Sequence, residues 1–286
     1  MEKIREAVAR AKTAHAADDE PNLEEFAPPA NEDRREQGAA SIPERALPNQ
    51  DVWLDARRLE NNRIIAHDIG DIRSKSIDMV RTQVLQTMDL SSWQVLGVTS
   101  PTAGCGKSML ATNLALSMAR QPERSVLLID LDFQKPQVAR YLGLKPDNGV
   151  LSVLSGRTKL EDSVATARIG DHSIFLLPCE GSRLNSSELM ACRAMGTMLR
   201  EIKQKFSNST IILDLPPMMP SDDVLSILPQ VDTALLVAAA GQSTKSEIQE
   251  CIRHLKSVPI ARFVLNKSRD RTANYYSRYG RYAKAS

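Results

Sequence analysis

Short continuous apolar runs recur through the second half of the chain. Two examples are Ile211-Ile212-Leu213 and the stretch from Ala234 to Ala238. A continuous run, unlike an alternating one, predicts a strand buried on both faces, as in a parallel sheet covered by helices. The predicted strands cover residues 94–100, 125–132, 173–178, 209–215, 233–239 and 262–266.

Stretches with a helical period separate these runs, over residues 75–88, 107–120, 187–206 and 243–257. The third follows Asn185-Ser186-Ser187-Glu188, which resembles a capping box ahead of periodic apolar residues. Strands that alternate with helices predict a doubly wound α/β domain, with a mostly parallel sheet and helices on both faces.

The first sixty residues follow a different pattern. Residues 1–12 predict a short amphipathic helix. Residues 13–50 hold five of the fifteen prolines and a largely acidic stretch, a composition that predicts a disordered linker. We therefore predict a helix with its linker over 1–60, a folded domain over 61–270 that starts near Asn61, and a tail over 271–286.

Composition narrows the function classes. Of 286 residues, 42% are hydrophobic and 25% charged, as in a soluble globular protein, and a net charge of +2 gives no case for nucleic-acid binding. The four cysteines form no CxxC pair, which fits a reducing cytoplasm rather than a metal site or disulfides. The sequence contains neither an apolar run near the ~20 residues of a membrane helix nor a secretory signal. We expect a cytoplasmic protein that meets a membrane only through a partner.

The first predicted strand runs through a glycine-containing loop into a helix. Residues 101–108, PTAGCGKS, fit the P-loop pattern GxxxxGK[ST], except that Pro101 stands in place of the first glycine. Backbone N–H groups of such a loop bind phosphate, a lysine reaches the β- and γ-phosphates, and a serine hydroxyl binds Mg²⁺. The loop therefore predicts an ATP site that uses Mg²⁺. Its predicted nucleotide-binding residues are Thr102, Ala103, Gly104, Cys105, Gly106, Lys107, Ser108 and Met109.

Acidic residues end two predicted strands. Asp130 and Asp132 close one apolar run, and Asp214 closes another. Ligands bind at the carboxyl ends of strands in open α/β sheets, so we expect these carboxylates beside the phosphate loop and its metal. A lone aspartate after a strand is often only a turn or cap residue, but two such strand ends beside a P-loop favour a working site. Asn266 ends the last predicted strand and is a candidate for hydrogen-bonding adenine.

With these motifs the sequence resembles the bacterial tyrosine kinases of capsule and exopolysaccharide assembly, most of all their stand-alone cytoplasmic form. That family uses a P-loop, a second motif of three hydrophobics and DxD, matched by 127–132, and a third of three hydrophobics and DxxP, matched by 211–217. It ends in a tyrosine-rich tail, and here four of five tyrosines fall in the last twelve residues. These are Tyr275, Tyr276, Tyr279 and Tyr282.

The resemblance implies an ATP-dependent kinase that phosphorylates its own tail tyrosines and regulates exopolysaccharide or capsule polymerisation and export. Lys107 and Mg²⁺ would neutralise phosphate charge, Ser108 and Asp214 would hold the metal with help from Asp130, and Asp130 or Asp132 would take the tyrosine proton. Implied partners are a membrane polysaccharide copolymerase that sets chain length, a tyrosine phosphatase and further copies of the chain, at the inner membrane.

The sequence departs from the family at three places. Ala103 stands where the family usually has proline, and Gln134 where it usually has arginine. The helix over 75–88 keeps only Arg81 of an ExxRxxR repeat that joins subunits in a ring. This loss favours a second hypothesis, a slow ATPase switch that regulates the copolymerase without being a kinase, like the related partitioning and septum-placing ATPases. Those ATPases carry a signature lysine where Thr102 stands, which favours the kinase.

Overall fold

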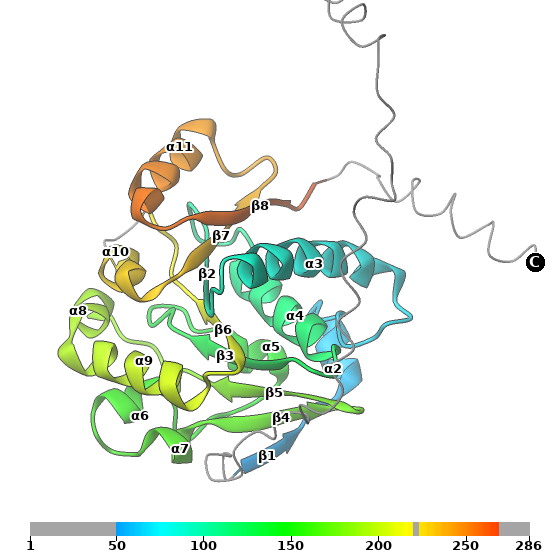
Figure 1. Ribbon diagram of the computed structural model, residues 1–286, viewed down its shortest axis with the longest axis vertical. Coiled ribbons are helices and arrows are strands. Elements are labelled where there is room, and N and C mark those ends of the chain that lie inside the picture. The colour runs from blue at the N-terminus through cyan, green and yellow to red at the C-terminus, as the bar shows by residue number, and fades with distance from the viewer. Residues whose placement is uncertain (1–49, 220–222, 269–286) are drawn as a thin grey trace, which may run out of the picture. The chain divides into compact units, whose positions relative to one another are not determined.

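The computed structural model describes residues 50–219 and 223–268 (Figure 1). Its strands form one sheet in the order β1-β4-β5-β3-β6-β2-β7-β8. All neighbouring strands run parallel except β4 and β5, so the predicted mostly parallel sheet is confirmed. The strands are β1 (Gln50–Trp53), β2 (Val95–Thr99), β3 (Ser125–Asp130), β4 (Ala165–Ile169), β5 (His172–Leu177), β6 (Ser209–Asp214), β7 (Thr233–Ala239) and β8 (Ile260–Asn266).

The sheet begins earlier than the predicted domain start near Asn61. Strand β1 pairs with β4 at the edge of the sheet, and Leu54 and Leu59 behind it are buried. Between them, Asp55 caps the helix α2 (Ala56–Asn61) by accepting a hydrogen bond from the Arg58 N–H. Residues before Asn61 are thus part of the sheet, and Leu54 and Leu59 join the apolar core on one of its faces.

The helices cover both faces of the sheet (Figure 1). Adjacent residues of β3 show this directly, since Leu127 joins the apolar core on one face and Leu128 the core on the other. The longer helices are α3 (Lys75–Leu90), α4 (Lys107–Ala119), α9 (Arg193–Lys205) and α11 (Lys245–His254), and the short ones α5 (Val138–Leu142), α6 (Val150–Leu154), α7 (Leu160–Ser163), α8 (Ser186–Ala191) and α10 (Asp223–Ile227). Short 3-10 turns are η2 (Ile72–Ser74), η3 (Leu228–Gln230) and η4 (Leu255–Ser257).

The single helix predicted over 187–206 is two helices. The helical conformation is interrupted at Cys192, whose extended backbone ends α8 and caps α9. The expected capping box at Asn185 was also wrong, because that side chain makes no cap hydrogen bond. Within the described ranges, no helix is both long and apolar enough to cross a membrane.

A partly buried group of charges joins α3 to α4. Asp78 accepts two hydrogen bonds of 2.8 Å from Arg120 and one of 2.6 Å from the Ser117 hydroxyl. Arg81 donates to the Ser117 carbonyl at 3.1 Å and lies 3.4 Å from Asp78. Arg81 is therefore engaged by contacts within the chain.

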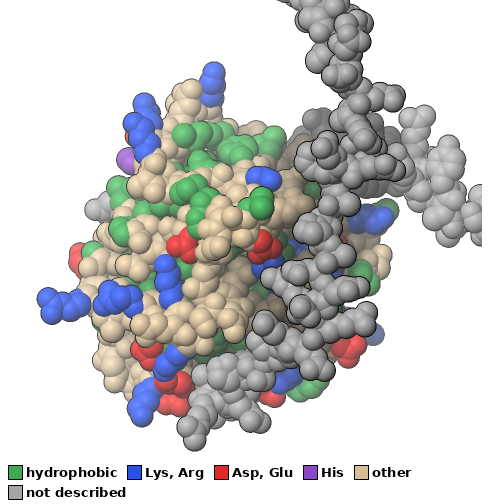
Figure 2. All heavy atoms as spheres, viewed as in Figure 1, with side chains coloured by type: hydrophobic (Ala, Val, Ile, Leu, Met, Phe, Trp, Pro, Cys, Tyr) green, Lys and Arg blue, Asp and Glu red, His purple; other side chains and the backbone are tan. Residues whose placement is uncertain are grey.

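Strand β8 lies at the other edge of the sheet and carries exposed apolar side chains. Phe263 and Leu265 are about half exposed, as is Ile252 of α11. Apolar side chains gather over β8 and α11 in the space-filling view (Figure 2). The predicted helix at 1–12, the linker and the tail lie outside the described residues.

Candidate nucleotide-binding site

The loop between β2 and α4 has the backbone that a phosphate cradle needs. Gly104 and Gly106 have φ angles of 82° and 94°, a left-handed region that strongly favours glycine. Gly106 caps α4, so the helix N-terminus with its free N–H groups and partial positive charge begins at Lys107. The strand, loop and helix thus occur in the predicted order at the carboxyl end of the central strands.

Lys107 lies between two carboxylates brought from other strands. Its ammonium nitrogen is 2.7 Å from Asp132 Oδ2 and 3.2 Å from Asp214 Oδ1, and it donates to the Ser108 hydroxyl at 3.1 Å. Burial alone lowers the pKa of Lys107, but Asp214 and Asp132 more than reverse this, so its pKa lies above the usual value. The lysine is therefore charged and is held by the same acids that would face a nucleotide's metal.

Asp214 has the free acceptor that a metal requires. Its side chain is fully buried, and its Oδ2 atom has no hydrogen-bond partner. Burial raises the pKa of Asp214, while Lys107 and the Ser108 hydroxyl limit that rise. Mg²⁺ prefers oxygen ligands and is commonly held by one or two protein groups together with substrate phosphates and water. Ser108 and Asp214 fit that donor set, although no cluster of three metal-ligating side chains occurs among the described residues.

Asp130 makes its hydrogen bonds to the backbone of the loop that follows it. Its Oδ1 accepts a hydrogen bond from the Asp132 N–H, and its Oδ2 accepts from the N–H groups of Gln137 and Val138, all at 3.0–3.1 Å. Burial and the charge of Asp214 raise the pKa of Asp130 to about 8. Strand β3 ends at Asp130, so Asp132 belongs to a loop and strand alternation does not orient it. Asp130 anchors that loop, while Asp132 reaches Lys107.

The structure places the amide of Asn266 against the phosphate loop. Asn266 Nδ2 donates to the Cys105 carbonyl at 2.8 Å, and its Oδ1 accepts from the Lys267 N–H at 2.8 Å. Nearby, Gln242 Nε2 donates to the Ala103 carbonyl at 2.7 Å. Gln242 carries no motif, so sequence reasoning missed it. The polar run after β7 was its only signal.

Thr102, Cys105 and Met109, which the sequence also predicts to bind nucleotide, make contacts with other side chains of the protein. Thr102 Oγ1 lies 3.6 Å from Cys105 Sγ, which in turn lies 3.4 Å from Ser243 Oγ. Met109 accepts a hydrogen bond from Asn113 of α4 through its sulfur. The Cys105 side chain thus packs between Thr102 of the same loop and Ser243 in the turn after β7.

Gln134, which replaces the family's arginine, also serves a local network. Its Nε2 donates to Ser186 Oγ at 2.8 Å and lies 3.4 Å from Asp223 Oδ2, and Ser187 donates to the same buried aspartate. These contacts tie the loop after β3 to α8 and α10 at the rim of the site.

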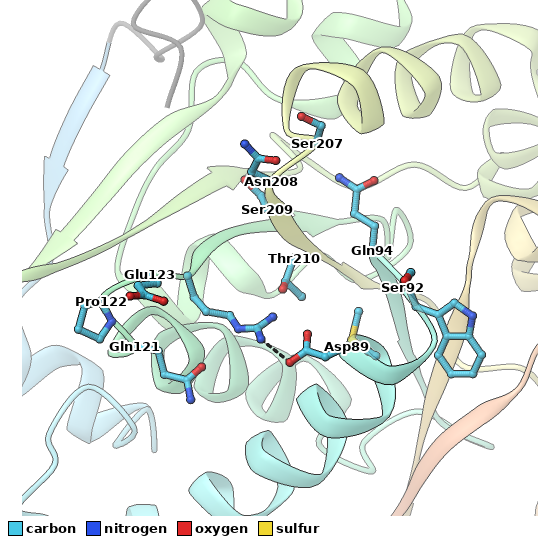
Figure 3. A pocket seen from close by; sticks show the side chains of 13 residues that line it. Asp89, Ser92, Gln94, Gln121, Pro122, Glu123, Ser207, Asn208, Ser209 and Thr210 are labelled. Atoms are coloured by element: carbon cyan, nitrogen blue, oxygen red, sulfur yellow. Dashed lines mark hydrogen bonds and ion pairs between the residues drawn. The ribbon is translucent and has the colours of Figure 1, made fainter. Parts of the chain in front are cut away.

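A separate hollow of about 690 Å³ lies at the end of the sheet where the central strands begin, opposite the phosphate loop (Figure 3). It is bordered by Ser92 and Gln94 before β2, by Arg124 before β3 and by Asn208 before β6, and an ion pair joins Arg124 to Asp89 of α3. Amino ends of parallel strands meet there, so this hollow does not belong to the phosphate site.

Fold and site together define a P-loop nucleotide-binding protein. The sequence profile of the CobQ/CobB/MinD/ParA nucleotide binding domain matches residues 96–284. The chain belongs to this family.

Among curated relatives, the chain is similar to three bacterial proteins. The putative tyrosine-protein kinase EpsB of Ralstonia nicotianae is 28% identical over 249 residues, which cover 82% of this chain and 32% of EpsB. The putative tyrosine-protein kinase CapB of Staphylococcus aureus is 26% identical over 204 residues, 70% of this chain and 87% of CapB. The succinoglycan biosynthesis transport protein ExoP of Rhizobium meliloti is 25% identical over 207 residues, 67% of this chain and 26% of ExoP.

The solved structure of the chimerical protein CapA2B2 shares the fold, with a TM-score of 0.65 at 22% identity over 77% of this chain and 94% of that one. The predicted resemblance to bacterial tyrosine kinases is confirmed by these relatives. The chain spans a third or less of the length of EpsB and ExoP, but most of the length of CapB.

Proposed function

We propose that the chain is an ATP-dependent protein-tyrosine kinase that phosphorylates the tail of a neighbouring copy. The observation that carries this proposal is the buried group of Lys107, Asp132 and Asp214 beside a phosphate loop, in a chain whose last residues hold four tyrosines. Relatives named tyrosine-protein kinases support it.

Charge stabilisation and positioning account for the chemistry. The N–H groups of the phosphate loop and the Lys107 ammonium bind the phosphates, and Ser108 with Asp214 would hold Mg²⁺, which supplies positive charge to the β- and γ-phosphates. The acceptor tyrosine gives its proton to a carboxylate, its oxygen bonds to the γ-phosphorus, and the bond to the ADP oxygen breaks.

Asp132 is the better placed of the two candidate bases. Both oxygens of Asp130 accept hydrogen bonds from backbone N–H groups. Asp132 accepts one such bond, from Lys135 to its Oδ1, while its Oδ2 pairs with Lys107 and would be released if that lysine turned to a bound phosphate. We therefore assign proton removal to Asp132 and loop support to Asp130.

The name of one relative supports a role in polysaccharide assembly. ExoP is named for the biosynthesis and transport of a polysaccharide, so we assign to this chain the regulation of exopolysaccharide or capsule assembly at the inner membrane. It would act there from the cytoplasm, through a membrane polysaccharide copolymerase, and a tyrosine phosphatase would reverse the modification.

The test is phosphate mapping by mass spectrometry on the full chain incubated with Mg-ATP, with and without a copolymerase's cytoplasmic segment. We expect phosphate on Tyr275, Tyr276, Tyr279 or Tyr282, none on Tyr141 within α5, and none at all in Asp214→Asn. Tyr141 is the matched control because it is the fifth tyrosine of the same chain. If every tail tyrosine stays unmodified in both samples, the kinase proposal fails.

A nucleotide-dependent switch is the second candidate, and the inward position of Arg81 favours it. If Arg81 keeps its contacts to Asp78 and Ser117, it cannot also join this chain to a neighbouring copy in the way that the family resemblance implies. ATP hydrolysis without tail phosphate, with copolymerase binding that differs between ATP and ADP, would establish the switch.

A further inference from the structure

Two carbonyl groups of the phosphate loop are held from outside by side chains of other elements. Gln242, in the turn between β7 and α11, donates to the Ala103 carbonyl at 2.7 Å. Asn266, the last residue of β8, donates to the Cys105 carbonyl at 2.8 Å. Alternate peptide groups of one short loop are thus fixed from the same side.

Peptide geometry gives these two bonds a consequence for the ligand. In a trans peptide, the carbonyl and the following N–H point in opposite directions. Holding the Ala103 carbonyl outward therefore turns the Gly104 N–H away from Gln242, and holding the Cys105 carbonyl does the same for Gly106. Both N–H groups then face the inside of the loop, where phosphate binds.

Both amides pack closely against loop glycines, and the contact at Gly106 leaves no space for a side chain. A Cβ atom on Gly106 would lie 2.2 Å from Asn266 Nδ2, and one on Gly104 would lie 3.5 Å from Gln242 Nε2. Lys267 completes the set: its ammonium donates to Gln242 Oε1 at 3.2 Å and its N–H to Asn266 Oδ1 at 2.8 Å. Within the described ranges, the contacts of Lys267 toward the loop run through these two amides.

We propose that Gln242, Asn266 and Lys267 form a brace that keeps the phosphate loop shaped for triphosphate binding. They are positioning residues for the ATP site of the proposed function. The Asn266 amide donates one hydrogen bond to the loop and accepts one from Lys267, and these two bonds fix its orientation against the Cys105 carbonyl.

Calorimetry on the full chain with Mg-ATP, Mg-GTP and Mg-tripolyphosphate tests the brace. Gln242→Ala and Asn266→Ala should each weaken all three ligands about fivefold, the effect of one lost hydrogen bond. Gln242→Ala with Lys267→Ala should bind no more weakly than Gln242→Ala alone, because Lys267 acts through Gln242. Gln249→Ala on the exposed side of α11 is the matched control and should bind like the parent.

Two results would overturn the inference. A loss confined to ATP, with tripolyphosphate unchanged, would make Asn266 an adenine reader, and additive losses in the double variant would make Lys267 a direct phosphate ligand. Hydrogen exchange without nucleotide gives an independent readout, in which the Gly104 and Gly106 amides should exchange faster in both amide variants than in Gln249→Ala. Unchanged exchange rejects the brace even if the protein binds no nucleotide, and faster exchange supports it even if the kinase proposal fails.

Discussion

Lys107→Met tests the charge balance of the site as well as its chemistry. The side chain of Lys107 is 8% exposed and is the positive partner that contacts both Asp132 and Asp214. Removing one partner of a buried ion pair costs about 3–5 kcal/mol because the remaining charge is left unpaired. We expect the variant to lose ATP turnover and about 4 kcal/mol of unfolding free energy. A domain of ordinary stability, roughly 5–15 kcal/mol, survives that loss in a folded state.

The deficit should depend on pH with a definite sign. Without the lysine, a proton on Asp214 removes the unpaired charge, and burial already raises the pKa of Asp214 above its unfolded value. Between those two pKa values the folded state binds more protons than the unfolded state, so stability rises as pH falls. Asp130, with a pKa of about 8, gives the parent the same sign. The relevant quantity is therefore the difference between variant and parent, which should shrink from pH 8 to pH 6.

Urea denaturation in EDTA at pH 8 and pH 6 measures both effects. Lys256→Met, an exposed lysine before β8, is the control and should unfold like the parent at both values. Adding Asp214→Asn to Lys107→Met should restore about 2 kcal/mol at pH 8, since it removes one of the unpaired charges. A full loss that is equal at both pH values would show that packing, not charge, is responsible, and the reasoning would fail.

Three further sets of variants test other parts of the molecule. Gly106→Ala should weaken Mg-ATP at least tenfold in calorimetry, because φ is 94° and a neighbouring amide occupies the Cβ position, whereas Gly196→Ala within α9 should bind like the parent. Asp132→Asn should slow tail phosphorylation roughly 100-fold or more, and Asp130→Asn less than tenfold, if Asp132 is the base. Asp78→Ala should cost about 3 kcal/mol in urea unfolding at pH 7, because it leaves a buried arginine unpaired.

The sequence predicted the central strands well and the edges poorly. Runs such as Ile211-Ile212-Leu213 are apolar throughout because both faces are buried, so they stand out in any window. Strand β4 is Ala165-Thr166-Ala167-Arg168-Ile169, with small and polar residues that suit a partly exposed position near the edge. Strand β1 has only four residues beside a proline-rich stretch, so composition concealed it.

The candidate site shows the same division. The phosphate loop, Lys107 and Asp214 follow from a motif with fixed spacing, and the structure brings them together. The different roles of Asp130 and Asp132 depend on where β3 ends, which no pattern in the run Leu127–Asp132 reveals. Gln242 reaches the loop across more than a hundred residues of sequence. Contacts of that kind depend on tertiary packing, which a single sequence does not encode in any local signal.

The direction of the two edge strands decides on which rim of the sheet the described domain begins and ends. Strand β4 is antiparallel to β5, and β1 is parallel to β4. The first residue of β1 therefore lies on the rim of the sheet where β8 and the other parallel strands end, which is also the rim that carries the phosphate loop. The start of β1 and the end of β8 lie at opposite ends of a row of eight strands, so they are about 34 Å apart along that rim, at ~4.8 Å per strand. The described domain therefore begins and ends on the same rim as the phosphate loop, at the two ends of that rim.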